Sequence, residues 1–231
     1  MNLALFGSGE FTDQVNDIDK YLISKFKPKN IAVLPTAAGA EADVNKWIEM
    51  AKEHYGKFNL KVIPVPILNN ADANQRYLVS LLEPADWIFF SGGDPGYLLD
   101  CLIDSKLWKV IASKLENGCL ISGSSAGAMV MGNYLLSLSF RRVGKDSKML
   151  WKNGLEIVDY TIIPHFDHFK RNKGFIRKMI KLSPKEVKAS WMGIDENTAI
   201  IFSGGECVVH GLGNVEIHAG RKTTVIKSTK A

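Results

Sequence analysis

The sequence contains few cysteines and no pattern typical of a metal site. Cys101, Cys119 and Cys207 lie far apart and match no metal-ligand spacing, and an odd count is a poor basis for a disulfide framework. Cys119 lies in an apolar run, where a cysteine usually packs as a small core residue. We therefore expect no metal, no cofactor and a reducing environment, with the cytoplasm as the default location.

Long apolar runs, internal repeats and linker-like segments are also missing. No apolar stretch approaches the roughly 20 residues that a membrane-spanning helix needs. The apolar residues 1–7 lack a basic leading region, so we interpret them as a first strand and not as a signal peptide. The 231 residues predict a single domain over 1–231, with a core over about 1–220 and a short basic C-terminal tail.

The positive charge of the chain is not concentrated in a motif. The formal net charge is +5, and the densest basic group, made of Arg221, Lys222, Lys227 and Lys230, lies in the tail. Nucleic-acid binding usually combines a basic patch with a recognisable binding motif. We therefore expect neither a nucleic-acid partner nor a membrane partner, and we expect a monomer or a homodimer.

What the sequence does contain is a regular alternation of short apolar runs and amphipathic stretches. The apolar runs predict strands over 2–7, 31–35, 60–65, 87–91 and 119–122. Between them, helical spacing predicts helices over 12–26, 41–55, 74–82, 96–102 and 106–115. Strands that are apolar on both faces are typical of a parallel sheet covered by helices.

After about residue 150 the pattern changes. We predict strands over 161–164, 199–202, 206–210 and 215–218, and a helix over 170–180. Glycine turns between the late strands indicate antiparallel hairpins at one edge. The sequence thus predicts an α/β fold with a doubly wound, mostly parallel sheet, helices on both faces and short antiparallel strands at the C-terminal edge.

A small-residue turn follows the fifth predicted strand and precedes a helix. Gly123–Ala128 places Ser125 at the tip of this turn, with Ser124 as a supporting residue. This layout resembles the nucleophile elbow of serine hydrolases, in which a strained turn exposes the serine at the sheet edge. The alternative is a phosphate-binding or structural glycine turn. No Gly-Lys-Ser/Thr follows, and the dinucleotide-binding glycine pattern is absent after the first strand.

A second glycine turn follows another strand, at Ser91–Asp94. An N–H group of Gly92 or Gly93, together with that of Ala126, could receive the oxygen of a tetrahedral intermediate. The alternative is an ordinary tight turn between a strand and a helix.

A serine nucleophile needs a base, and two histidines lie directly after a predicted strand. We favour His165, because it comes first after the strand, and we keep His168 as the alternative. His54 lies in a predicted surface helix, and His210 and His218 lie in late strands, so we expect structural roles for these three.

The acid that would hold the imidazole has two candidates in the turn Gly193–Ala199. These are Asp195 and Glu196, at the head of a late strand. The alternative is an ordinary Asp-Glu turn.

Four segments together resemble the dipeptidase E and cyanophycinase family of serine peptidases, which shares the class I glutamine amidotransferase-like fold. They are Leu5–Glu10, Phe90–Asp94, Gly123–Ala128 and Gly193–Ala199, within a match over roughly residues 2 to 210.

The resemblance implies that Ser125 is the nucleophile and that His165 or His168 is the base. It also implies that Glu196 is the acid, as in the cyanophycinase branch. The dipeptidase E branch has an aspartate soon after the serine, whereas no acid occurs here until Asp146.

Both branches act at aspartyl residues, which implies hydrolysis of short aspartyl or isoaspartyl peptides through an acyl-enzyme intermediate. We therefore expect a small peptide substrate. Candidates for substrate binding are Asp94, Arg141, Arg142 and Arg171. Two alternatives remain: a glutamine amidotransferase-like domain, which would need a cysteine at the elbow, and a non-catalytic binding domain, which would need no serine–histidine pair.

Overall fold

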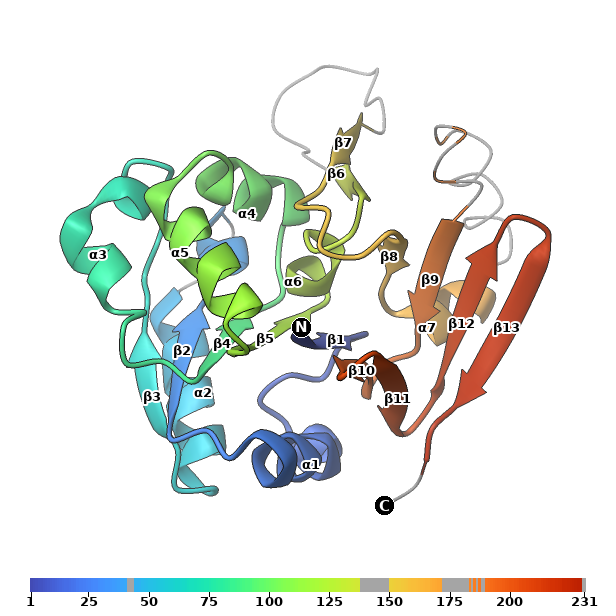
Figure 1. Cartoon of the computed structure of the whole chain (residues 1–231), viewed down its shortest axis with the longest axis horizontal. Coiled ribbons are helices and arrows are strands. Elements are labelled where there is room, and N and C mark those ends of the chain that lie inside the picture. The colour runs from blue at the N-terminus through green and yellow to red at the C-terminus, as the bar shows by residue number, and fades with distance from the viewer. Residues whose placement is uncertain are drawn as a thin grey trace.

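The computed structural model describes residues 1–40, 44–137, 150–171, 183, 185, 187 and 190–229, and its centre is a large mixed sheet (Figure 1). Within the described residues this sheet has seven strands, in the order β11-β10-β1-β5-β4-β2-β3. Five of them are parallel: β1 (Asn2–Phe6), β2 (Asn30–Leu34), β3 (Lys61–Pro64), β4 (Trp87–Phe90) and β5 (Leu120–Ser124). The antiparallel hairpin β10 (Thr198–Ser203) and β11 (Glu206–Gly211) extends the sheet beside β1, so the predicted fold class is confirmed.

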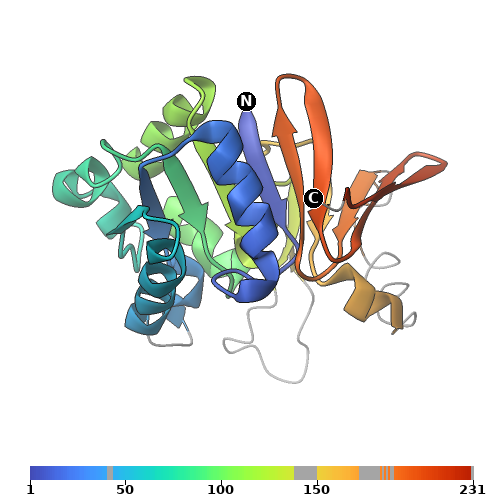
Figure 2. The ribbon, with the colours of Figure 1, turned by 90° about the horizontal axis from the view of Figure 1, so that it is seen from below.

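Helices cover both faces of this sheet because both faces of its strands are apolar (Figures 1 and 2). Along β1, Leu3 and Leu5 belong to one buried cluster, whereas Ala4 and Phe6 belong to another. The cluster of Ala4 and Phe6 includes side chains of α1 (Asn16–Phe26) and α2 (Val44–Gly56). The opposite cluster includes side chains of α3 (Arg76–Ser80), α4 (Pro95–Leu102), α5 (Lys106–Glu116) and α6 (Ala126–Met129). Short 3₁₀ turns lie at η1 (Asp13–Val15), η2 (Thr36–Ala40) and η3 (Asp72–Asn74).

A second sheet lies beside β10 and β11, and the sequence analysis did not predict it. Its order is β13-β12-β9-β8, from β8 (Thr161–Ile163), β9 (Ser190–Ile194), β12 (Asn214–Ala219) and β13 (Lys222–Lys227). The basic segment expected as a tail therefore supplies strand β13, paired with β12. The remaining described elements are a small hairpin, formed by β6 (Tyr134–Ser137) and β7 (Leu150–Asn153), and helix α7 (Phe166–Arg171). Most of the helix predicted over 170–180 lies outside the described residues.

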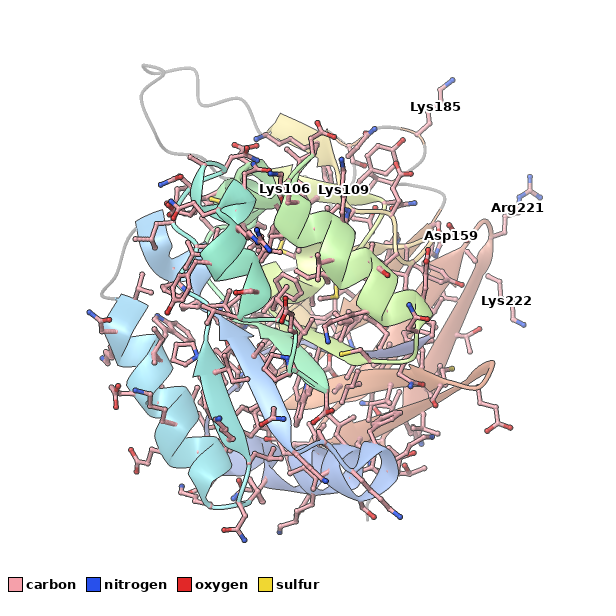
Figure 3. The ribbon with its side chains drawn as sticks, turned by 60° about the vertical axis from the view of Figure 1, so that its left-hand side comes forward. Lys106, Lys109, Asp159, Lys185, Arg221 and Lys222 are labelled. Atoms are coloured by element: carbon pink, nitrogen blue, oxygen red, sulfur yellow. The ribbon has the colours of Figure 1, made fainter. Side chains whose placement is uncertain are left out.

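Basic side chains are spread over separate parts of the molecule (Figure 3). Lys106 and Lys109 extend from α5, whereas Arg221 and Lys222 lie at the turn between β12 and β13. Across the described ranges, no helix has both the length and the apolar character that crossing a bilayer requires.

His54 is buried, although the sequence analysis placed it in a surface helix. It lies on the inner stripe of α2 together with Ile48 and Ala51. Its Nε2 atom lies 2.7 Å from Asp19 Oδ2 on α1, and both side chains are 1% exposed. Burial raises the pKa of Asp19, and the contact with His54 opposes this shift. The pair therefore joins α1 to α2 beneath the sheet.

We expect His54→Ala to lower the free energy of unfolding by about 3–5 kcal/mol, because it leaves the Asp19 carboxyl buried without its partner. Urea unfolding followed by circular dichroism measures this. The control is Lys20→Ala, which removes the exposed Lys20–Asp17 pair and should change stability by no more than about 1 kcal/mol. Equal effects of the two substitutions would contradict a structural role for the buried pair.

Candidate active site

The turn between β5 and α6 has the geometry of a nucleophile elbow. Ser125 adopts φ 51° and ψ −110°, a strained conformation for a residue with a side chain. A Cβ atom at Gly123 would collide with the backbone of Gly127, and one at Gly127 would collide with Phe90. The small residues therefore let β5 turn sharply into α6. Ser125 is half-buried at the tip, whereas Ser124 is fully buried beneath it.

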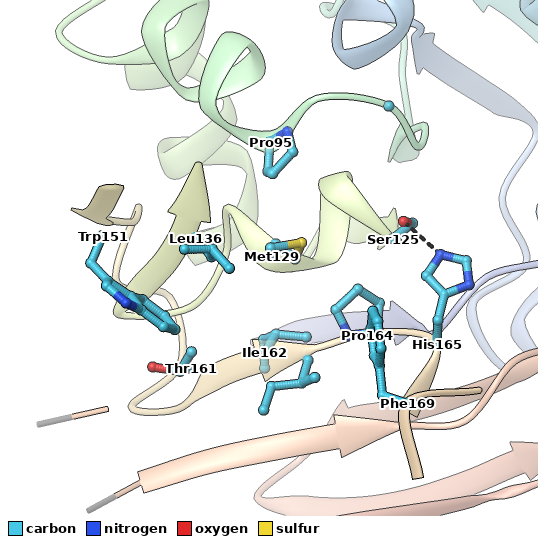
Figure 4. A pocket seen from close by; sticks show the side chains of 12 residues that line it. Pro95, Ser125, Met129, Leu136, Trp151, Thr161, Ile162, Pro164, His165 and Phe169 are labelled. Carbon is cyan, nitrogen blue, oxygen red and sulfur yellow. Dashed lines mark hydrogen bonds between the residues drawn. The ribbon is translucent and has the colours of Figure 1, made fainter. Parts of the chain in front are cut away.

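Three side chains from three loops form a continuous chain of contacts at this tip. Ser125 Oγ lies 3.0 Å from His165 Nε2 (Figure 4), and His165 Nδ1 lies 2.7 Å from Glu196 Oε1. Ser125 follows β5, His165 follows β8, and Glu196 lies between β9 and β10. Polar side chains at the carboxyl ends of strands commonly form the sites of such folds.

The alternative base and acid are directed elsewhere. His168 lies on α7 and is exposed, with its ring against Phe169. Asp195 is buried and accepts hydrogen bonds from the Asn214 N–H (2.9 Å) and from Lys170 Nζ (3.3 Å). Neighbouring residues at a strand end point in opposite directions, so Asp195 faces away from the imidazole that Glu196 reaches.

Two carboxylates support this arrangement, and the sequence analysis gave neither a role. Asp167 Oδ1 accepts a hydrogen bond from the Glu196 N–H (2.9 Å), which fixes the loop that carries Glu196. Glu10 is buried behind the elbow and accepts hydrogen bonds from the Ser124 hydroxyl and from the Gly92 N–H (2.8 Å). The available signal for Glu10 was an acid in a glycine-rich loop directly after β1.

The contact with Glu10 corrects one part of the predicted oxyanion hole. The Gly92 N–H already donates to a buried carboxylate, so it is not free for an oxyanion. Gly93 is exposed, has φ 140° and lines the cavity beside Ser125. Ala126 is the first residue of α6, where backbone N–H groups lack partners within the helix. Gly93 and Ala126 thus remain the candidate donors.

The residues assigned to substrate binding do not gather at this site. Asp94 caps α4 by accepting a hydrogen bond from the Tyr97 N–H (2.9 Å), so its carboxylate has a structural role. Arg171 is exposed at the end of α7. Neither residue lines the cavity beside Ser125. Arg141 and Arg142 lie outside the described residues.

None of the three cysteines lines the cavity beside Ser125. Burial raises the pKa of Cys101 and of Cys119 to about 11, so both are protonated at neutral pH. Cys207 is exposed on β11. No group of three potential metal ligands occurs in the part of the chain that the structure describes.

The chain is similar to known proteins in sequence and in fold. An uncharacterized peptidase of Listeria innocua is 25% identical over 170 residues, which cover 73% of this chain and 79% of the relative. Cyanophycinase of Synechococcus elongatus is 27% identical over 153 residues, but these are 64% of this chain and 46% of that protein. The crystal structure of a peptidase from an acI-B1 actinobacterium superposes with a TM-score of 0.80 and 28% identity, over 98% of this chain and 94% of that chain. The family model described as peptidase family S51 matches residues 3–210, and the chain therefore belongs to this family of serine peptidases.

Proposed function

We propose that Ser125, His165 and Glu196 form a catalytic triad that hydrolyses peptide bonds through an acyl-enzyme. The observation that carries this proposal is the unbroken contact from the Ser125 hydroxyl through the imidazole to the Glu196 carboxylate. A serine hydroxyl becomes an effective nucleophile when an adjacent base accepts its proton and a third group orients the base.

The residues then act in a defined order. His165 Nε2 accepts the proton as Ser125 Oγ attacks the peptide carbonyl, and Glu196 stabilises the resulting imidazolium. The N–H groups of Gly93 and Ala126 receive the negative oxygen of the tetrahedral intermediate. His165 next donates its proton to the leaving amine, which leaves the acyl group on Ser125. A water molecule, deprotonated by the same imidazole, releases the acid product.

The substrates in this proposal are short aspartyl or isoaspartyl peptides, so the enzyme is a dipeptidase or an exopeptidase. Its support is the likeness to cyanophycinase and the four shared sequence segments. Arg171, exposed at the end of the helix that follows the histidine loop, is the partner for the substrate carboxylate in this proposal, because the neighbouring Lys170 already pairs with Asp195 and Glu216. A glutamine amidotransferase-like activity is less well supported, because the elbow carries a serine and the buried thiols are protonated.

A dipeptide panel tests the substrate. We expect Asp-Leu or isoAsp-Leu to be hydrolysed roughly ten- to a hundredfold more efficiently than Ala-Leu, because one charge-assisted hydrogen bond contributes about 1.5–3 kcal/mol. Asn-Leu is the matched control, since it keeps the shape of aspartate without the charge. Equal kcat/KM values for Asp-Leu, Asn-Leu and Ala-Leu would remove the aspartyl specificity and leave the serine-peptidase assignment.

A further inference from the structure

A cavity of about 190 Å³ opens beside the Ser125–His165 pair (Figure 4). At its near end lie Ser125 and His165, and at its far end lie Leu136 and Trp151. Met129 and Ile162 line the space between these ends. The cavity therefore leads away from the reacting hydroxyl along a wall of apolar side chains.

The described residues of the wall offer a charged group little besides the N–H of Trp151 Nε1, which is buried without a hydrogen-bond partner. Among the described residues that line the cavity, His165 is the only ionisable one. The hydroxyl of Thr161 already donates to Asn133 Oδ1 (3.1 Å). Lys152, next to Trp151 in the sequence, extends to Asp100 instead (2.8 Å). A charged side chain among these described residues would lose its hydration without gaining an ion pair from a lysine or an arginine, which is unfavourable.

The size of the cavity fits one side chain. Sites for drug-sized ligands commonly exceed about 300 Å³, so this space is too small for a whole peptide. Filling it with an apolar side chain would remove apolar surface from water on both partners, which is the main favourable contribution to such contacts.

We infer that this cavity binds the apolar side chain of the substrate residue whose amine leaves on cleavage. The inference rests on the proposed function, in which an aspartyl residue is the acyl group. Among the described residues that line it, the cavity presents no lysine or arginine to an aspartate carboxylate, so we assign it to the second residue. The position beside His165 agrees with this, because that imidazole donates the proton to the leaving amine. The preferred substrates are thus Asp-Xaa or isoAsp-Xaa dipeptides in which Xaa is Leu, Ile, Met or Phe.

The first test varies the second residue at constant aspartate. We expect kcat/KM for Asp-Leu and Asp-Phe to exceed that for Asp-Lys and Asp-Glu by at least about tenfold, since even one methylene in an apolar pocket can discriminate tenfold. Values within about twofold for all four dipeptides would overturn the inference, because a preference of that size is smaller than a single methylene contributes.

The second test places a charge at the far end of the cavity. Trp151→Glu should lower the Asp-Leu to Asp-Lys ratio by at least about tenfold, because the new carboxylate opposes leucine and pairs with lysine. Trp151→Phe is the matched control and should keep the preference for leucine. If Trp151→Glu does not fold, as judged by circular dichroism, Met129→Glu makes the same test from the α6 side. An unchanged ratio in a folded glutamate variant would contradict the inference.

Two further measurements separate this inference from the proposed function. If aspartate proves unnecessary, the ratio of Ala-Leu to Ala-Lys turnover still reports on the cavity. If no dipeptide is cleaved, NMR titration of Ser125→Ala with leucinamide and with lysinamide measures binding without turnover. Stronger binding of leucinamide that Trp151→Glu abolishes would support the cavity assignment even though the activity had failed. Equal binding of the two amides would overturn it.

Discussion

Ser125→Ala should lower kcat/KM for peptide hydrolysis by at least about 10⁴-fold, because it removes the attacking oxygen and leaves only binding and oxyanion stabilisation. A fluorophosphonate probe, which reacts with activated serine hydroxyls, should label the wild type and not this variant. The physical basis is the position of Ser125 at the tip of the turn before α6. From there its Oγ atom lies 3.0 Å from His165 Nε2.

Ser124→Ala is the matched control for this prediction. The Ser124 hydroxyl is fully buried and donates to Glu10, so its removal leaves a buried carboxylate short of one hydrogen bond. We expect a loss of stability of about 1–3 kcal/mol, probe labelling that persists, and a much smaller loss of activity. Activity lost with Ser124→Ala and retained with Ser125→Ala would show that Ser124, and not Ser125, is the nucleophile.

The central sheet could be predicted from the sequence because its strands carry a strong local signal. Trp87–Phe90 is buried along its whole length, and such a run indicates a strand covered on both faces. In the second sheet, strands were predicted over 161–164 and 215–218, which are β8 and β12, but not over β9 or β13. Ser190–Ile194 contains a glycine, which disfavours a strand. The lysines of Lys222–Lys227 led us to expect a basic tail, although its threonine, valine and isoleucine residues favour a strand. Both segments pair with β12: β13 follows it directly in a hairpin, whereas β9 precedes β10 and β11 in the chain.

The site loops could also be predicted, since they follow predicted strands, but the residues alone left two candidates for the base and two for the acid. His165 and His168 lie three residues apart, and Asp195 and Glu196 are neighbours. Which member reaches Ser125 depends on the direction in which each side chain leaves the backbone. Glu10 is a further example, because its role depends on its closeness in space to Gly92 and Ser124.

His165→Ala is the second substitution for which we expect a very large effect. It should lower kcat by about 10⁴- to 10⁶-fold, because His165 is, within the described part of the chain, the base that contacts Ser125 Oγ and would donate a proton to the leaving amine. Since the imidazole acts in proton transfer and not in substrate binding, KM should change much less than kcat. Steady-state kinetics with the best dipeptide of the panel measures both values, and circular dichroism checks that the variant is folded.

His168→Ala is the control, because this histidine lies three residues after His165 but is exposed on α7. Exposed substitutions usually change free energies by no more than about 0.5 kcal/mol, so we expect activity within about twofold of the wild type. The pair of variants separates the two bases that the sequence left open. A full loss with His168→Ala and near-normal activity with His165→Ala would require His168 to reach Ser125 during catalysis. The contact from Ser125 through His165 to Glu196 would then belong to a resting arrangement and not to the reacting one.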